Sequence, residues 1–129
     1  MKTNWSKHWK ASSQPRKQRK YRCNAPLHVK HKFMRTHLSK ELIKKYNTRN
    51  IILRKGDKVK IVRGQFKSKI GLVSKVDLKK GVVFIEGAER TKKNGAKVPC
   101  PIHPSNLIIL SLELGDKKRG KILNRTKGA

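Results

Sequence analysis

The stretch VKIVRGQFKSKIGLVSKV, from Val59 to Val76, has apolar residues at both ends that alternate with lysine and arginine. Such period-two alternation predicts two β-strands, each with one buried face. The middle of the stretch holds glycines, polar residues and positive charge, which is typical of a tight connection. We therefore predict a β-hairpin whose tip is shaped to receive an anion.

The tip of this hairpin carries the clearest binding signal in the chain. The two strands bring to one connection Arg63, Gly64, Lys67, Ser68, Lys69 and Gly71. Glycine lets a ligand approach the backbone closely, and consecutive N–H groups in such a turn can form a concave anion site. With three added cations the loop suits a phosphate but does not read a base sequence. The alternative is that the glycines only serve the turn and the lysines form a solvated rim.

The residues that follow Ile51 predict a mainly β fold. Strands are expected over Lys58–Val62, Gly71–Asp77, Gly81–Gly87 and Asn106–Leu114, and Asn94-Gly95 predicts a hairpin within Glu89–Cys100. Short strands joined by tight turns are typical of a small barrel. The expected core consists of Val59, Ile61, Leu72, Val73, Val76, Val83, Ile85, Leu107, Ile109 and Leu112, with Val62 and Phe84 unassigned.

Charge divides the chain into three predicted parts. Residues 1–50 form a basic, partly helical extension, residues 51–114 the barrel, and residues 115–129 a short basic tail. Within the extension, Ser12–Arg22 is expected to be extended or disordered when free, because it has little apolar area. One helix is predicted over Ala25–Arg35 with Asn24 as its cap, and another over Lys40–Tyr46 with Ser39 as its cap.

The net charge limits the class of partner. The 129 residues include 35 Lys and Arg but only 7 Asp and Glu, which gives a formal net charge of +28. A compact domain with this charge repels itself unless a polyanion neutralises it. Candidates are nucleic acid, an anionic membrane surface or an acidic protein. No segment approaches the ~18 unbroken apolar residues of a membrane span, the N-terminus has no apolar secretory core, and no membrane partner is expected.

The residue types that catalysis or metal binding would need are not grouped. Cys23, His28, His31 and His37 lie close in sequence, but a structural zinc site usually pairs two nearby cysteines with two histidines. Contact with RNA or solvent is the preferred interpretation of these histidines. The carboxylates are scattered, and no nucleophile or nucleotide-binding motif occurs. We expect no enzyme activity, no metal, no cofactor and no small-molecule substrate, and we expect Cys23 and Cys100 to be free thiols.

Aromatic and polar residues add further candidates. Tyr21, Trp5 and Trp9 lie among basic residues, where an aromatic ring can stack on an unpaired base or anchor a neighbouring protein. Stacking is favoured for Tyr21, and the roles of the tryptophans stay open. His103 and Ser105 flank a proline, so they either fix a rigid turn or hydrogen-bond a phosphate.

Several quoted segments resemble a known family. GDKVKIVRGQFKSKIGLVSKV is similar to a KOW motif, in which Gly64, Lys67 and Gly71 match the pattern and Ser68 replaces its second glycine. NAPLHVKHKFM, LSKELIKKYNTRN, LRKGD and IHPSNLII all resemble the eukaryotic and archaeal form of the large-subunit ribosomal protein that bacteria number twenty-four. The resemblance runs from about Asn24 to Leu114, in the family's order and spacing.

The resemblance implies an SH3-like barrel in a structural constituent of the large ribosomal subunit. It implies binding to large-subunit rRNA, a part in early assembly, neighbouring ribosomal proteins near the exit of the peptide tunnel, and a cytoplasmic location after nucleolar assembly if the source is eukaryotic. The alternative is a KOW-domain transcription elongation factor that binds RNA polymerase. The predicted RNA contacts are Arg16, Lys17, Arg19, Lys20, Tyr21, Arg22, His28, Lys30, Lys32, Arg35, Arg49, Arg54, Arg63, Gly64, Lys67, Ser68, Lys69, Gly71, Arg90, Lys92, Lys93, His103 and Ser105.

Overall fold

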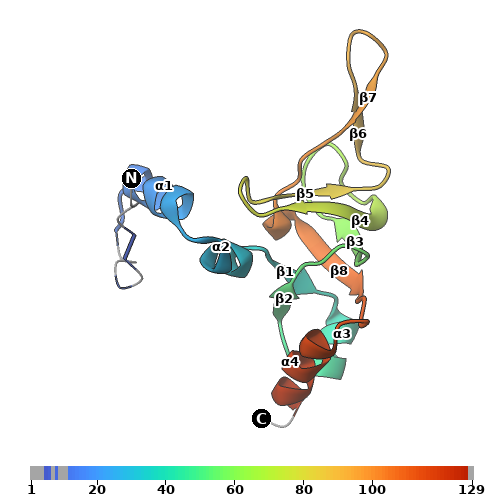
Figure 1. The fold of residues 1–129 in the computed structure, drawn as a ribbon. Helices are drawn as coiled ribbons and strands as arrows, with labels where there is room; N and C mark the ends of the chain where they lie inside the picture. The colour runs from blue at the N-terminus through green and yellow to red at the C-terminus, as the bar shows by residue number, and fades with distance from the viewer. Residues whose placement is uncertain (1–4, 7, 9–11, 128–129) are drawn as a thin grey trace.

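The computed structural model describes residues 5, 6, 8 and 12–127. Its centre is a six-stranded sheet in the order β2-β1-β8-β3-β4-β5 that curves into a small barrel (Figure 1). The strands are β1 Arg35–Leu38, β2 Asn50–Ile52, β3 Lys58–Ile61, β4 Ile70–Asp77, β5 Val82–Ile85 and β8 Leu107–Ser111. All neighbours pair antiparallel except β1 and β8, which run parallel. A bridge between Val83 and Ile102 continues the pairing beyond β5.

The strands expected from period-two alternation are confirmed as β3, β4, β5 and β8, each within two or three residues of its predicted ends. The hairpin is confirmed as well: β6 Glu89–Thr91 pairs with β7 Lys97–Pro99 through the Asn94-Gly95 turn, where Gly95 has φ +79°. This hairpin projects away from the barrel (Figure 1). The mainly β fold therefore follows from local patterns in the sequence.

Strands β1 and β2 were not predicted, and both lie at or before the expected start of the barrel. In β1, Thr36 and Leu38 point inward while Arg35 and His37 are exposed. Because Thr36 is polar although it is buried, a hydropathy pattern does not show the alternation of this strand. The Thr36 hydroxyl donates to the Pro104 carbonyl at 3.4 Å. The predicted boundary at residue 50 therefore does not coincide with the edge of the sheet.

The helix prediction over Ala25–Arg35 is wrong in its bounds. The structure has α1 over Pro15–Asn24 and α2 over Leu27–Phe33, so Asn24 ends a helix and does not cap one. Ala25 is extended between them (ψ +137°), because a residue before proline disfavours the helical region. Ser12–Arg22 was expected to be extended or disordered when free, whereas the structure has a helix from Pro15, whose fixed φ suits the first turn.

The predicted helix over Lys40–Tyr46 is confirmed as α3, with the Ser39 hydroxyl accepting from the Leu42 N–H at 3.4 Å. Asn47 ends it in the left-handed conformation, with φ +49°. A 3-10 turn, η1, spans Pro104–Asn106 just before β8. Each of these short elements has the end signals that its sequence predicts.

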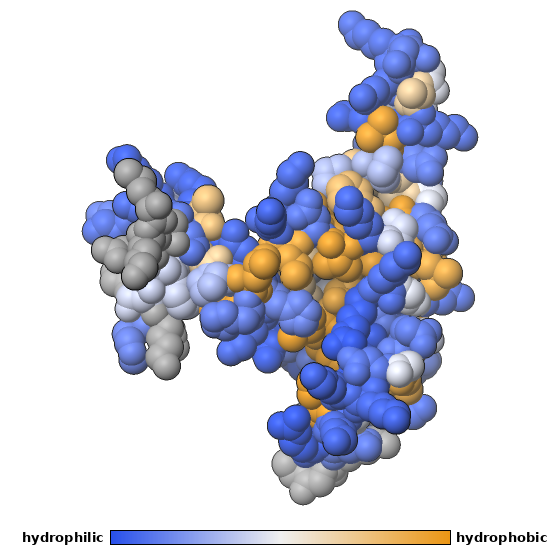
Figure 2. Space-filling model, in the orientation of Figure 1, coloured by the Kyte–Doolittle hydropathy of each residue, from blue (hydrophilic) through white to orange (hydrophobic). Residues whose placement is uncertain are grey.

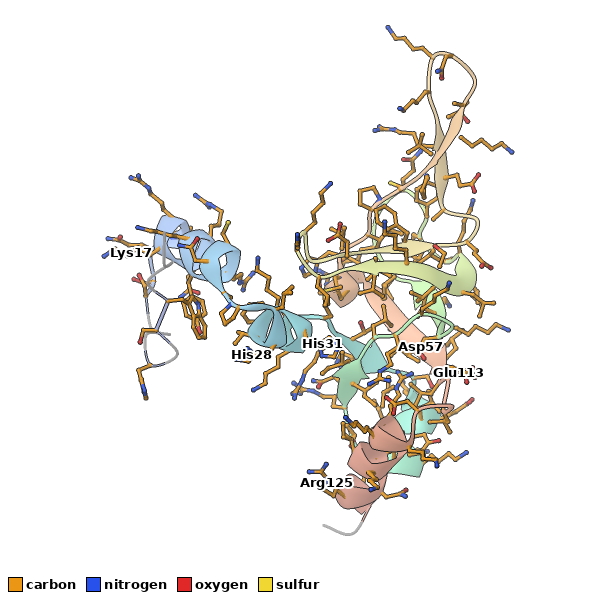
Figure 3. The ribbon with its side chains drawn as sticks, in the orientation of Figure 1. Lys17, His28, His31, Asp57, Glu113 and Arg125 are labelled. Carbon is orange, nitrogen blue, oxygen red and sulfur yellow. The ribbon has the colours of Figure 1, made fainter. Side chains whose placement is uncertain are left out.

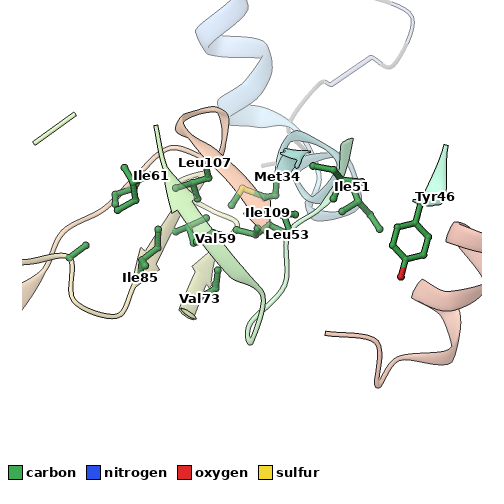
Figure 4. Packing of buried hydrophobic residues seen from close by; sticks show 14 of the residues in the cluster. Met34, Tyr46, Ile51, Leu53, Val59, Ile61, Val73, Ile85, Leu107 and Ile109 are labelled. Carbon is green, nitrogen blue, oxygen red and sulfur yellow. The ribbon is translucent and has the colours of Figure 1, made fainter. Parts of the chain in front are cut away.

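One cluster of buried apolar side chains fills the barrel and extends to α3 and the C-terminal segment (Figure 4). Of the predicted core, Val59, Ile61, Val73, Val83, Ile85, Leu107 and Ile109 are buried, and Val76 and Leu112 pack against the cluster. The cluster also includes residues from the predicted extension and tail, namely Met34, Leu38, Tyr46 and Leu123. The core is therefore larger than the barrel segment alone provides.

Leu72 is a wrong core prediction, because it is 44% exposed. Its neighbour Val73 takes the inward position, and the register between β4 and β5 shifts between Val73 and Lys75. This β-bulge changes which side chains face inward, so Val76 also packs on the core although it lies three residues after Val73. Sequence alternation alone does not locate a bulge.

The C-terminal segment is a helix, α4 Lys117–Lys127, and it is anchored to the barrel. The Arg119 guanidinium binds the Asp57 carboxylate through two bonds of 2.6 and 2.7 Å, and both side chains are almost fully buried. Arg119 also donates to the Glu113 carbonyl at 2.9 Å. Asp57 and Glu113 lie together beside α4 in Figure 3. The predicted basic tail is therefore a packed part of the fold.

Candidate nucleic-acid interface

The Arg63–Gly71 connection forms a compact loop between β3 and β4. Gly64 has φ +99° and Ser68 has φ +72°. The N–H groups of Lys67, Ser68 and Lys69 donate to the carbonyls of Gly64, Ile61 and Phe66, at 3.1, 2.8 and 3.1 Å. Because these three N–H groups already hydrogen-bond to carbonyls of the protein, an anion at these positions can be bound only by the side chains.

The cationic side chains of this loop are exposed. Lys69 lies over the Phe66 ring, with Nζ 5.1 Å from the ring centroid, and donates to the Gly87 carbonyl at 3.4 Å. The loop therefore lies next to the base of the β6–β7 hairpin, whose Arg90, Lys92 and Lys93 are exposed too. The loop and the hairpin therefore place exposed cations on neighbouring parts of the surface, where Glu86 and Glu89 are exposed as well.

Gly71 has a structural reason to lack a side chain. A Cβ at this position would lie 2.5 Å from the Glu86 carbonyl oxygen and 2.8 Å from Cγ2 of Ile85. Both distances are far below normal contact, so the close approach of β4 and β5 requires the glycine. The approach of a ligand is not needed to explain it.

Helix α1 carries a second group of predicted contacts, all exposed: Arg16, Lys17, Arg19, Lys20 and Arg22. The helix lies apart from the barrel, with Lys17 directed outward (Figure 3). The first turn of α1 has no acidic residue. Tyr21 is partly buried, because the Trp5 ring lies 5.2 Å from its ring and the Trp5 indole N–H donates to the Tyr21 carbonyl at 3.2 Å.

A groove lies between the helices α1 and α2 on one side and the β4–β5 turn on the other. It has a volume of about 450 Å³. Its lining brings together three predicted contacts, Arg22, Lys30 and His103, from widely separated parts of the sequence. Figure 2 shows an apolar area between α2 and the barrel, with hydrophilic surface around it. The tertiary structure thus assembles a basic site that no local motif describes.

Comparison with known proteins agrees with this basic barrel. A family model that describes the ribosomal proteins L26 of eukaryotes and L24 of archaea matches residues 12–126. The chain belongs to this family. Relatives named large ribosomal subunit protein uL24 occur in Methanosphaera stadtmanae and Methanothrix thermoacetophila, each 48% identical over 114 residues. Another, in Methanosarcina barkeri, is 47% identical over 114 residues. The alignments cover 88% of this chain and 97–98% of each relative.

Membership of this ribosomal family makes the chain a structural ribosomal protein and not an enzyme. Both cysteines are free, as predicted. Among the described residues, no three histidine, cysteine or carboxylate side chains are grouped so as to hold a metal ion. In the same part of the chain, no helix is long and apolar enough to cross a membrane. Trp9 lies outside the described residues.

The other predicted contacts of this family member occupy separate positions. His28 is exposed on α2 (Figure 3). Lys32 is exposed on the same helix, Arg35 on β1, and Arg49 just before β2. Arg54 instead forms an ion pair with Asp116. The N–H of Lys118, and then the Arg54 side chain, hold the pKa of Asp116 below its ordinary value. Arg54 is thus partly neutralised within the protein.

His103 and Ser105 form the rigid turn that was one of their two predicted roles. His103 Nδ1 lies 2.7 Å from the Ser105 hydroxyl and accepts from the Ser105 N–H at 3.3 Å. These two contacts fix the imidazole ring through Nδ1 and do not involve its other nitrogen, Nε2. Both side chains remain exposed. The turn is compatible with a phosphate contact, which stays a prediction.

Two functional candidates in the groove were missed, Lys79 and Lys80 at the β4–β5 turn. The Asp77 carboxylate accepts from the Lys80 N–H at 3.0 Å, and this bond is the main reason that the pKa of Asp77 is lowered. The carboxylate thus shapes the turn that presents the lysines. The sequence DLKKG carried a recognisable Asx-turn signal, but nothing local indicated that the turn faces the helices.

Proposed function

We propose that this protein is a structural constituent of the large ribosomal subunit that binds large-subunit rRNA through its basic surfaces. The observation that carries the proposal is the placement of its few carboxylates. Asp57 is buried against Arg119, Asp116 pairs with Arg54, and Asp77 holds a turn. Neither of the two ion pairs found among the described residues involves a lysine or arginine of the loop, the hairpin or α1. Although Glu86 and Glu89 are exposed nearby, these cations thus keep their charge available for phosphates.

The family supports a more specific assignment. We propose that the protein acts early in subunit assembly, lies near the exit of the peptide tunnel beside other ribosomal proteins, and works in the cytoplasm. Crosslinking the assembled subunit and sequencing the attached RNA and peptides tests these contacts. Co-purification with RNA polymerase in place of the large subunit would support the alternative, a KOW-domain elongation factor.

The salt dependence of RNA binding tests the role of the loop. Contact with about ten phosphates gives a log–log slope of roughly −7 to −9. Replacing Arg63, Lys67 and Lys69 with alanine is expected to weaken binding and to flatten this slope by about 2–3 units, because up to three phosphate contacts are lost. The measurement is a titration of an rRNA fragment at several KCl concentrations.

The matched control retains charge. The double variant Lys67→Arg/Lys69→Arg should keep the slope of the wild-type protein, because guanidinium groups also neutralise phosphates. A triple alanine variant with an unchanged slope would remove the loop from the RNA interface.

A further inference from the structure

The groove between α2 and the β4–β5 turn has an apolar floor and a basic rim. Phe33, Met34 and Leu78 supply apolar lining, and Lys79 and Lys80 extend the charge of Arg22 and Lys30. Its volume, about 450 Å³, lies in the range of roughly 300–1,000 Å³ typical of small-ligand sites. The residues that line it include no carboxylate. The site therefore favours an anionic ligand that also has an apolar face.

Phe33 is the unusual member of this lining. It ends α2 and is 40% exposed, although most residues around it on the helix are basic. Aromatic rings next to cations are the common platform for nucleobases, since every base has a π-face and carries a phosphate nearby. An apolar side chain of a neighbouring protein would match the ring but would leave the four cations unused.

The walls of the groove are held in place by the fold. Met34, directly after Phe33, is buried, and its carbonyl accepts from the Leu53 N–H at 3.1 Å, which ties the end of α2 to the sheet. On the opposite wall, the Gly81 N–H donates to the Asp77 carbonyl at 2.9 Å. The site is thus preorganised, which lowers the entropy cost of binding.

We infer that this groove holds one unpaired nucleotide of the bound RNA, with its base against Phe33 and its phosphates among the rim cations. The inference rests on the proposed rRNA binding and adds the kind of RNA feature that is recognised. A base inside a duplex is stacked on both faces and cannot reach the ring, whereas a bulged or looped base can. This contact would give the protein a preference for RNA with a bulged or looped base over fully paired RNA, which its exposed lysines alone do not provide.

The test uses the full-length protein and two hairpin RNAs. One has a single bulged 2-aminopurine nucleotide, and the other is the fully paired equivalent. The wild-type protein should bind the bulged RNA about 5- to 100-fold more tightly, as expected for one base–aromatic stack, and should change its fluorescence on binding. Phe33→Leu should remove the preference and the fluorescence change. Phe33→Tyr, which keeps the aromatic face, should retain both.

The control is Leu27→Ala, because Leu27 is 55% exposed on the same helix but does not line the groove. It should behave like the wild type, and thermal unfolding checks that each variant is folded. Binding of both RNAs by the wild type without a preference, or a preference that survives in folded Phe33→Leu, would overturn the nucleotide site while leaving rRNA binding intact. Failure of the wild type to bind either hairpin, and also the rRNA fragment used in the salt titration, would refute the proposed function itself.

Discussion

At the scale of single residues, Ser68 adopts a conformation that normally belongs to glycine. Its φ of +72° places a Cβ in the left-handed region, which costs an L-residue roughly 1–2 kcal/mol. Ser68→Gly should therefore stabilise the protein by about 0.5–1 kcal/mol, since greater freedom of the unfolded chain offsets part of the gain. Denaturant unfolding measures this difference.

Ser68→Ala serves as the control, because it keeps the strain and removes only the hydroxyl. Its free energy of unfolding should stay within about 0.5 kcal/mol of the wild type. If Ser68→Gly were less stable than the wild type, the hydroxyl and not the backbone would determine the contribution of this position.

At Gly71, in contrast to Ser68, the neighbouring residues leave no room for a side chain. Gly71→Ala should destabilise the fold by about 1–3 kcal/mol, because the Cβ overlaps the Glu86 carbonyl. Gly120→Ala in α4 is the matched control: nothing lies within 4 Å of the new Cβ, so the helix should gain about 0.5–1 kcal/mol. A stable Gly71→Ala variant that has lost RNA binding would instead assign the glycine to the ligand.

At the scale of elements, the buried pair between Asp57 and Arg119 joins α4 to the barrel. Asp57 also accepts from the N–H groups of Arg54 and Glu113, at 2.8 and 3.0 Å. Arg119→Met leaves a buried carboxylate without its cation and should cost about 3–5 kcal/mol. Asp57→Ala should cost at least as much, because two backbone donors lose their acceptor as well. Denaturant unfolding followed by circular dichroism measures both.

The coupling between the two side chains can be isolated with a double variant. Asp57→Asn/Arg119→Met should be clearly more stable than the sum of the single variants Asp57→Asn and Arg119→Met predicts, since each single variant leaves one charge unpaired and the double variant leaves none. Lys121→Met, at an exposed position of α4, should change the free energy of unfolding by less than about 0.5 kcal/mol. Additive effects of the two single substitutions would show that the pair is not coupled.

At the scale of the whole molecule, the net charge of +28 opposes folding of the free protein. Salt screens this repulsion, so raising KCl from about 0.05 to about 0.5 M should stabilise the free protein by about 1 kcal/mol, or roughly 4 °C in Tm. The same change should weaken RNA binding by orders of magnitude. Thermal unfolding in KCl measures the first effect, and a Tm that falls with salt would show that ion pairs outweigh the repulsion.

Local signals in the sequence were enough for much of the fold. The alternation in KVKIV, the Asn94-Gly95 turn and the Ser39 cap each report on residues that are neighbours in the chain, and β3, the β6–β7 hairpin and α3 follow from them. The net charge likewise predicted a polyanion partner without any structure. These features depend on backbone geometry and composition, which a short segment determines by itself.

The tertiary structure alone decided the features that join distant segments. The parallel pairing of His37 with Ile108 and the burial of Arg119 against Asp57 link residues more than sixty positions apart. The groove between α2 and the β4–β5 turn arises in the same way, because Phe33 and Lys79 line one groove only after the sheet has formed. A local pattern carries no information on such contacts, since their free energy is gained only when separate elements pack together.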